Sequence, residues 1–105
     1  MNNMELVAAE LEAAKKKHPK FVDRFTHWNK METRDTLQRC RESLRDHKVE
    51  NSVEPMHVLQ CELAEAYDAY ARGKFAHAVQ ELAQCAAVCI RAMEHVEKEM
   101  ENKTK

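Results

Sequence analysis

Four polar side chains stand at one repeated spacing in the second half of the chain. Glu62 and Glu65 are three residues apart, and so are Glu81 and Gln84. Residues at positions i and i+3 are neighbours on a helix surface, so each pair projects from its helix as a unit. If the two helices pack antiparallel, the two pairs can converge.

Carboxylates that converge repel one another unless a cation joins them. Oxygen ligands suit Mg²⁺ or Mn²⁺, and Mg²⁺ usually keeps several waters and reaches toward substrate phosphates. Such a centre hydrolyses phosphate esters or phosphoanhydrides. The same spacing also occurs on ordinary solvated helices, so the spacing alone leaves both interpretations open.

The composition predicts that helices carry these pairs. The 105 residues include one Gly and two Pro, and Ala, Glu, Lys and Leu are abundant. These residues favour helices, whereas the β-branched residues that favour sheets are sparse. We therefore expect one all-α domain that spans residues 1–105.

Charge and hydropathy narrow the classes of partner. The formal net charge is −1, which gives no sign of nucleic-acid binding. No apolar run approaches the roughly 20 residues of a membrane helix. The first residues lack a basic region followed by an apolar stretch, so we expect no signal peptide and a cytoplasmic location.

The hydrophobic periodicity predicts about four helices in an antiparallel bundle, because the connections between them are short. Their expected ranges are Met4–Lys17, about Met31–His47, Pro55–Arg72 and about Lys74–Met100. Residues 20–30 contain a short apolar anchor, either a single turn or an extended segment, made of Phe21, Val22, Phe25 and Trp28. We expect a loop at residues 48–54 and a frayed tail at residues 102–105.

The two helices that carry the acidic pairs each have a predicted apolar face, with the acids on its flank. On the third helix this face comprises Met56, Leu59, Leu63, Ala66, Tyr67 and Tyr70. On the fourth it comprises Val79, Leu82, Ala86, Cys89, Ile90 and Met93.

The segment from His57 to Met93 resembles the core of the MazG-like, all-α nucleoside triphosphate pyrophosphohydrolases. That family carries Glu-x-x-Glu on one helix and Glu-x-x-Asp on the next, where this chain has Glu62-x-x-Glu65 and Glu81-x-x-Gln84. The stretch from Glu81 to Arg91 is similar to a small, often phage-associated branch of the family. The stretch from Glu10 to Pro19 resembles the start of that branch more loosely.

The resemblance implies Mg²⁺-dependent hydrolysis of a nucleoside triphosphate to a monophosphate and pyrophosphate. Glu62, Glu65 and Glu81 would hold the metal or orient the attacking water. Gln84 stands where the family has Asp, and its neutral amide cannot act as a base. The site would then bind metal more weakly, hold one ion rather than two, or be inactive. The family builds its site at subunit interfaces, which implies a homodimer or homotetramer.

Other residues carry competing interpretations. Lys74 and Arg91 could contact nucleotide phosphates, or could be ordinary exposed charges. Trp28 could stack on a nucleobase or fill a core. The four cysteines suit buried, reduced thiols; a zinc site from His57, Cys61, Cys85 and Cys89 is a weaker alternative.

A second class of function is a non-catalytic helical interaction module. In that case the acidic flank is merely solvated, and an exposed apolar stripe docks a partner helix.

Overall fold

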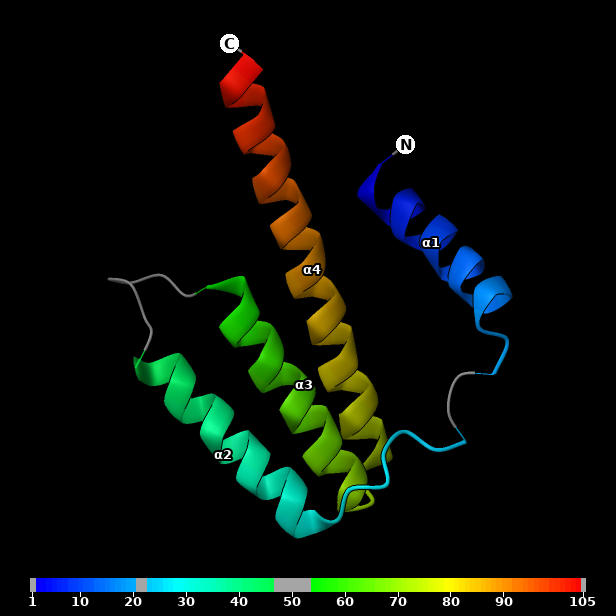
Figure 1. The fold of residues 1–105 in the computed structure, drawn as a ribbon, viewed down its shortest axis with the longest axis vertical. Coiled ribbons are helices and arrows are strands. Elements are labelled where there is room, and N and C mark those ends of the chain that lie inside the picture. Colours follow the sequence, from blue (N-terminus) through cyan, green and yellow to red (C-terminus); the bar gives the residue numbers. More distant parts are fainter. Residues whose placement is uncertain (1, 21–22, 47–53, 105) are drawn as a thin grey trace. The chain divides into compact units, whose positions relative to one another are not determined.

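The computed structural model describes residues 2–20, 23–46 and 54–104, and every regular element in these ranges is an α-helix. The helices are α1 (Asn3–Lys17), α2 (Lys30–Asp46), α3 (Pro55–Ala71) and α4 (Phe75–Thr104), as Figure 1 shows. The all-α prediction is confirmed, and most bounds agree within one residue. Phe21, Val22 and nearly all of the predicted loop lie outside the described residues.

The predicted end of the last helix was wrong. α4 continues past Met100 to Thr104, where a frayed tail was expected. Residues 101–104 contain neither Gly nor Pro, and Glu101 and Lys103 favour helix, so nothing in this stretch stops the helix.

Local hydrogen bonds explain where α1 and α2 begin. The Asn2 side chain accepts a hydrogen bond from the Glu5 backbone N–H at 2.8 Å, which caps α1. Asn29 and Glu32 form a reciprocal capping box: Asn29 Oδ1 accepts from the Glu32 N–H at 2.9 Å, and Glu32 Oε1 accepts from the Asn29 N–H at 3.1 Å. Each cap satisfies backbone donors that a helix start leaves unpaired.

A tight turn at Gly73 joins α3 to α4. Gly73 has a φ of +76°, a left-handed conformation that glycine adopts without a steric penalty. The Lys74 N–H donates to the Ala69 carbonyl at 2.8 Å, and the Gly73 N–H donates to the Tyr70 carbonyl at 2.9 Å. These bonds close the end of α3 and reverse the chain direction.

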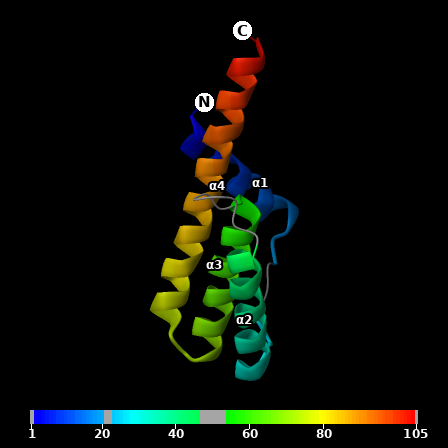
Figure 2. The ribbon, with the colours of Figure 1, turned by 90° about the vertical axis from the view of Figure 1, so that its left-hand side faces the viewer.

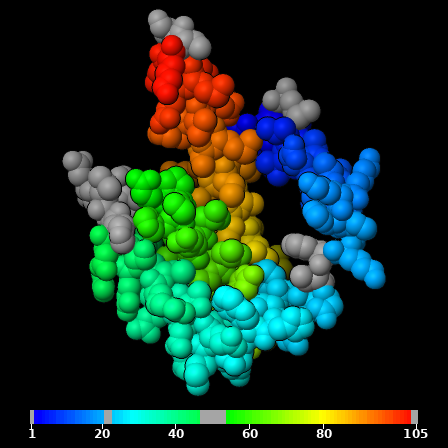
Figure 3. Space-filling model, in the orientation of Figure 1, coloured from blue at the N-terminus to red at the C-terminus, as the bar shows by residue number. Residues whose placement is uncertain are grey.

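The chain forms two compact units, Phe25–Cys89 and Met1–Arg24 with Ile90–Lys105, and α4 contributes to both. In the first unit, Figures 1 and 2 agree that α3 lies between α2 and the first half of α4, and that successive helices run antiparallel. In the space-filling view, the side chains of α2 lie directly against those of α3 (Figure 3).

The described core of this unit consists mostly of small side chains. The buried apolar residues are Leu37, Cys61, Ala64, Ala66, Ala69 and Ala78. The predicted apolar faces were therefore wrong in part, because Leu63 is 40% exposed and Val79 is 67% exposed. Alanine faces let helix backbones approach closely. The helices therefore pack on their alanine faces, and the larger side chains stay exposed to solvent.

An aromatic cluster holds the segment before α2 against α3, within the same unit. Phe25 contacts Tyr67 with ring centroids 4.5 Å apart, and Trp28 contacts Tyr67 at 5.4 Å. Both pairs have edge-to-face geometry, which aromatic rings favour. The predicted apolar anchor is thus confirmed at Phe25 and Trp28.

In the second unit, a hydrogen bond joins the start of α1 to the last part of α4. Asn3 Nδ2 donates to Glu97 Oε1 at 2.8 Å. No residue of α1 is buried. None of the described helices combines the length and the apolar character that a membrane crossing needs.

Candidate metal centre

The three glutamates singled out by their spacing lie together. One carboxylate oxygen from each of Glu62, Glu65 and Glu81 lies within 4.8 Å of the other two. Glu62 and Glu65 come from α3 and Glu81 comes from α4, so the antiparallel turn at Gly73 brings the pairs into register. Glu81 is only 6% exposed, whereas Glu62 and Glu65 are half-buried.

Each acid also has a polar partner outside the triad. Arg41 Nη2 donates to Glu65 Oε1 at 3.1 Å. His77 Nε2 lies 3.2 Å from Glu81 Oε1, an ion pair when the imidazole is protonated. The amide orientation that suits Gln84 turns its nitrogen toward the acids, where it donates to Glu62 Oε2 and, at 3.1 Å, to Glu81 Oε2.

Crowding and burial make two of the carboxyls harder to ionise. Burial raises the pKa of Glu65 above its ordinary value, hydrogen bonding to Glu81 raises it further, and Arg41 opposes the shift. Burial likewise raises the pKa of Glu81, and hydrogen bonding to Glu62 adds to the effect. Both shifts have the sign that burial and nearby like charges give to a carboxyl group.

A cavity of about 380 Å³ lies beside the acids and is bounded by α2, α3 and α4. It combines two acids of the triad with several basic side chains. Its lining residues are Leu37, Arg41, Glu65, Asp68, Ala69, Arg72, Lys74, His77 and Glu81. A neighbouring hollow shares Leu37, Arg41, Asp68 and Arg72 with this cavity and adds Arg34 and Arg45.

The two predicted phosphate ligands lie in different surroundings. Lys74 lines the cavity with Glu65 and Glu81. Arg91 is exposed and does not line it. Arg91 stands ten residues beyond Glu81 on α4, a rise of about 15 Å along the helix. Contact of either residue with phosphate stays a prediction.

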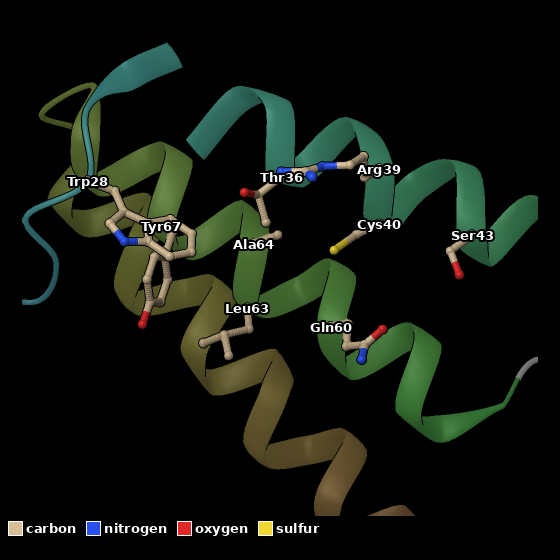
Figure 4. A pocket seen from close by; sticks show the side chains of 9 residues that line it. All are labelled: Trp28, Thr36, Arg39, Cys40, Ser43, Gln60, Leu63, Ala64 and Tyr67. Atoms are coloured by element: carbon tan, nitrogen blue, oxygen red, sulfur yellow. The ribbon is translucent and has the colours of Figure 1, made fainter. Parts of the chain in front are cut away.

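Trp28 belongs to a separate cavity of about 480 Å³ between α2 and α3. Figure 4 shows Trp28 and Tyr67 at one end of this cavity and Ser43 at the other. The Trp28 cavity shares no lining residue with the cavity beside the acids. A nucleobase stacked on Trp28 would therefore occupy a different cavity from the one that adjoins the triad.

The cysteines do not gather into a metal site within the described ranges. The three glutamates are the one group of potential ligands brought together there, and His57 and the cysteines form none. All four cysteines are free. Cys61 is buried as predicted, but Cys40 and Cys85 are only half-buried and Cys89 is exposed.

Sequence reasoning missed Arg41 as a neighbour of the triad. Arg41 is one of several exposed arginines on α2, and nothing in its local sequence separates it from the others. Its position depends on how α2 packs against α3. His77 could have been found, since it precedes Glu81 by four residues and shares its helix face.

Comparison of the chain with protein-family models, with curated proteins and with solved structures finds no match in any of the three. The resemblance to the MazG-like family therefore depends on the four motif positions and the short stretches around them.

Proposed function

We propose that the triad of Glu62, Glu65 and Glu81 binds a divalent cation, Mg²⁺ or Mn²⁺, and that the chain hydrolyses nucleoside triphosphates to monophosphates and pyrophosphate. One observation carries the proposal: three carboxylates within 4.8 Å of one another adjoin a cavity lined by basic side chains. Acids alone attract only a cation, whereas acids beside Arg41, Arg72 and Lys74 suit a cation together with a polyphosphate.

The donor set of the triad fits a hard cation. All three side chains offer oxygen, which Mg²⁺ and Mn²⁺ prefer. Burial raises the pKa values of Glu65 and Glu81, neighbouring carboxyls raise them further, and a bound cation would favour the ionised forms of both groups. A bound cation would polarise a phosphoryl oxygen and lower the pKa of its water.

The basic side chains beside the triad can bind the negatively charged phosphates of the substrate. Arg72 Nε pairs with Asp68 Oδ2 at 2.9 Å, and Arg41 pairs with Glu65, so both guanidinium groups are held in place. A pre-positioned guanidinium can bind phosphate oxygens in a bidentate manner. Lys74, at the turn before α4, would contribute a mobile ammonium group to the same cavity.

Hydrolysis adds one water across the bond between the α-phosphorus and its bridging oxygen. The water oxygen bonds to the α-phosphorus, the bridging bond breaks, and pyrophosphate leaves with the bridging oxygen. A carboxylate of the triad accepts the water's proton.

Gln84 should affect how tightly the triad binds a cation. In its favoured orientation its amide nitrogen, not its oxygen, faces Glu62 and Glu81. To ligate a cation, the amide must rotate and give up two hydrogen bonds. We therefore propose weaker metal binding than a fourth carboxylate would give, and we expect Gln84→Asp to bind Mg²⁺ more tightly.

The test is an assay of pyrophosphate release from a panel of ribo- and deoxyribonucleoside triphosphates with Mg²⁺ or Mn²⁺. We expect release that requires the metal and falls by at least about 100-fold in Glu62→Gln, because the carboxylate that ligates the cation is lost. Glu94→Gln, an exposed position on α4, is the matched control and should keep full activity.

Two results would overturn the proposal. One is pyrophosphate release that persists unchanged in Glu62→Gln. The other is no release with any nucleotide in wild type and in Gln84→Asp, together with no rise in thermal stability on addition of either metal. The second result would favour the interaction module, for which the exposed apolar side chains Phe75 and Val79 provide a surface.

A further inference from the structure

Two cysteines stand at matching positions on α2 and α3. Thr33 Oγ1 donates to Asp68 Oδ1 at 3.0 Å, which fixes how these antiparallel helices align. Cys40 follows Thr33 by seven residues, and Cys61 precedes Asp68 by seven. Seven residues are about two turns of an α-helix, so each cysteine shares the helix face of the residue seven positions away. The alignment therefore sets Cys40 of α2 opposite Cys61 of α3.

Three further observations agree with this alignment. Leu37 and Ala64, which the same alignment sets opposite each other between the two pairs, are both buried. Figure 4 shows the Cys40 side chain pointing from α2 toward α3, on the side where Ala64 lies. Burial raises the pKa of the Cys61 thiol, and the charge of Cys40 raises it further, an effect that only a nearby group has. Both thiols thus belong to the contact between α2 and α3.

The two thiols differ in their access to solvent. Cys61 is 5% exposed, whereas Cys40 is half-buried and lines the Trp28 cavity of about 480 Å³. A small oxidant in that cavity can reach the Cys40 sulfur without separating the helices. Redox-sensitive cysteines are typically accessible and have a second thiol nearby with which they form a disulfide. Cys40 has the accessible position of such a pair, and Cys61 has the shielded one.

We propose that Cys40 and Cys61 form a redox modification site, at which a peroxide converts the two thiols into a reversible disulfide that links α2 to α3. First, the Cys40 sulfur bonds to one peroxide oxygen, the O–O bond breaks and one water leaves, so Cys40 becomes a sulfenic acid. Next, the Cys61 sulfur bonds to the Cys40 sulfur, the S–O bond breaks and a second water leaves with the thiol proton. The thiols lose two electrons, and the peroxide gains them.

This disulfide would lie close to the contact between α2 and the acids. Arg41 directly follows Cys40 and donates to Glu65, which stands one turn beyond Cys61 on α3. A bond between the two cysteines would restrict sliding of α2 along α3 at that contact. The modification site does not rest on the proposed metal centre, because neither thiol belongs to the triad.

The test treats the folded full chain with hydrogen peroxide, blocks the remaining thiols and maps disulfides by mass spectrometry after trypsin digestion. We expect the free thiols to fall from four to two, with one link within the chain between Cys40 and Cys61, which dithiothreitol reverses. In a glutathione redox buffer, the equilibrium constant for this link should be at least about 10-fold higher in the folded chain than in urea, because the fold holds the thiols together.

Variants separate the helix alignment from chance encounters between thiols. Cys40→Ser should lose the link, and Cys89→Ser should keep it. Cys40→Ser/Gln38→Cys moves the α2 thiol about 200° around the helix to an exposed position, so it should fold with unchanged circular dichroism and form no link. The proposal would be overturned by wild type that forms no link between Cys40 and Cys61, by wild type that pairs other cysteines instead, or by an equal link to Cys61 in the shifted variant.

Discussion

Glu81→Gln should change stability in opposite directions with and without metal. The Glu81 side chain is 8% exposed, and its ligand oxygen lies within 4.8 Å of those of Glu62 and Glu65. At an effective dielectric constant near 20, two unit charges at that distance repel by about 3.5 kcal/mol. The His77 contact and the hydrogen bonds from Gln84 offset much of this repulsion. Removal of one charge should therefore stabilise the metal-free protein by about 1 kcal/mol, or about 5 °C in Tm.

Thermal unfolding followed by circular dichroism measures this effect. With a chelator present, Glu81→Gln should melt above wild type. With excess Mg²⁺ the order should reverse, because wild type gains binding free energy and the variant loses a ligand. Glu94→Gln should follow wild type in both conditions. If Glu81→Gln melts below wild type in the chelator, the triad is not electrostatically strained, and the reasoning from crowding fails.

Two further predictions concern the same unit. In the metal-free protein, the raised pKa values of Glu65 and Glu81 should lower the free energy of unfolding as pH rises from their ordinary value of 4.5 through their folded values. Denaturant titrations should therefore show wild type losing stability over that pH window relative to the Glu65→Gln/Glu81→Gln variant. A difference in stability that does not change with pH would contradict the shifts. The hydroxyl of Thr33, which is fully buried, lies 3.0 Å from Asp68 Oδ1. Thr33→Val should lower the free energy of unfolding by about 1–2 kcal/mol, whereas Thr33→Ser keeps the hydroxyl and should lose less stability. Equal losses in the two variants would show that the hydrogen bond does not contribute to stability.

Local signals in the sequence were sufficient to predict the helices, apart from the end of α4. Pro55 at a helix start and Gly73 after a helix end mark α3, and the composition leaves little alternative to an all-α chain. The convergence of the acids was also predictable. It needs only the i, i+3 spacing and one tight antiparallel turn, both of which are visible in the sequence.

The faces on which the helices pack were harder to predict. Hydropathy weights favoured the side of α4 that carries Val79, but α3 packs on the side that carries Ala78. Helix backbones pack closely where the residues between them are small, whereas hydrophobic periodicity gives most weight to large side chains. The periodicity therefore did not predict the alanine face on which α3 packs. The contact of Arg41 with Glu65 depends on this packing between α2 and α3, so no local pattern marks it.

Binding of a single divalent ion by Glu62, Glu65 and Glu81 can be measured directly with Mn²⁺, whose free aqueous ion gives a strong paramagnetic resonance signal. Titration of the full chain should show one saturable site per chain, which Mg²⁺ displaces. That site should disappear in Glu62→Gln and in Glu65→Gln and persist in Glu94→Gln. Equal Mn²⁺ binding by wild type and the two triad variants would contradict a metal centre at these residues.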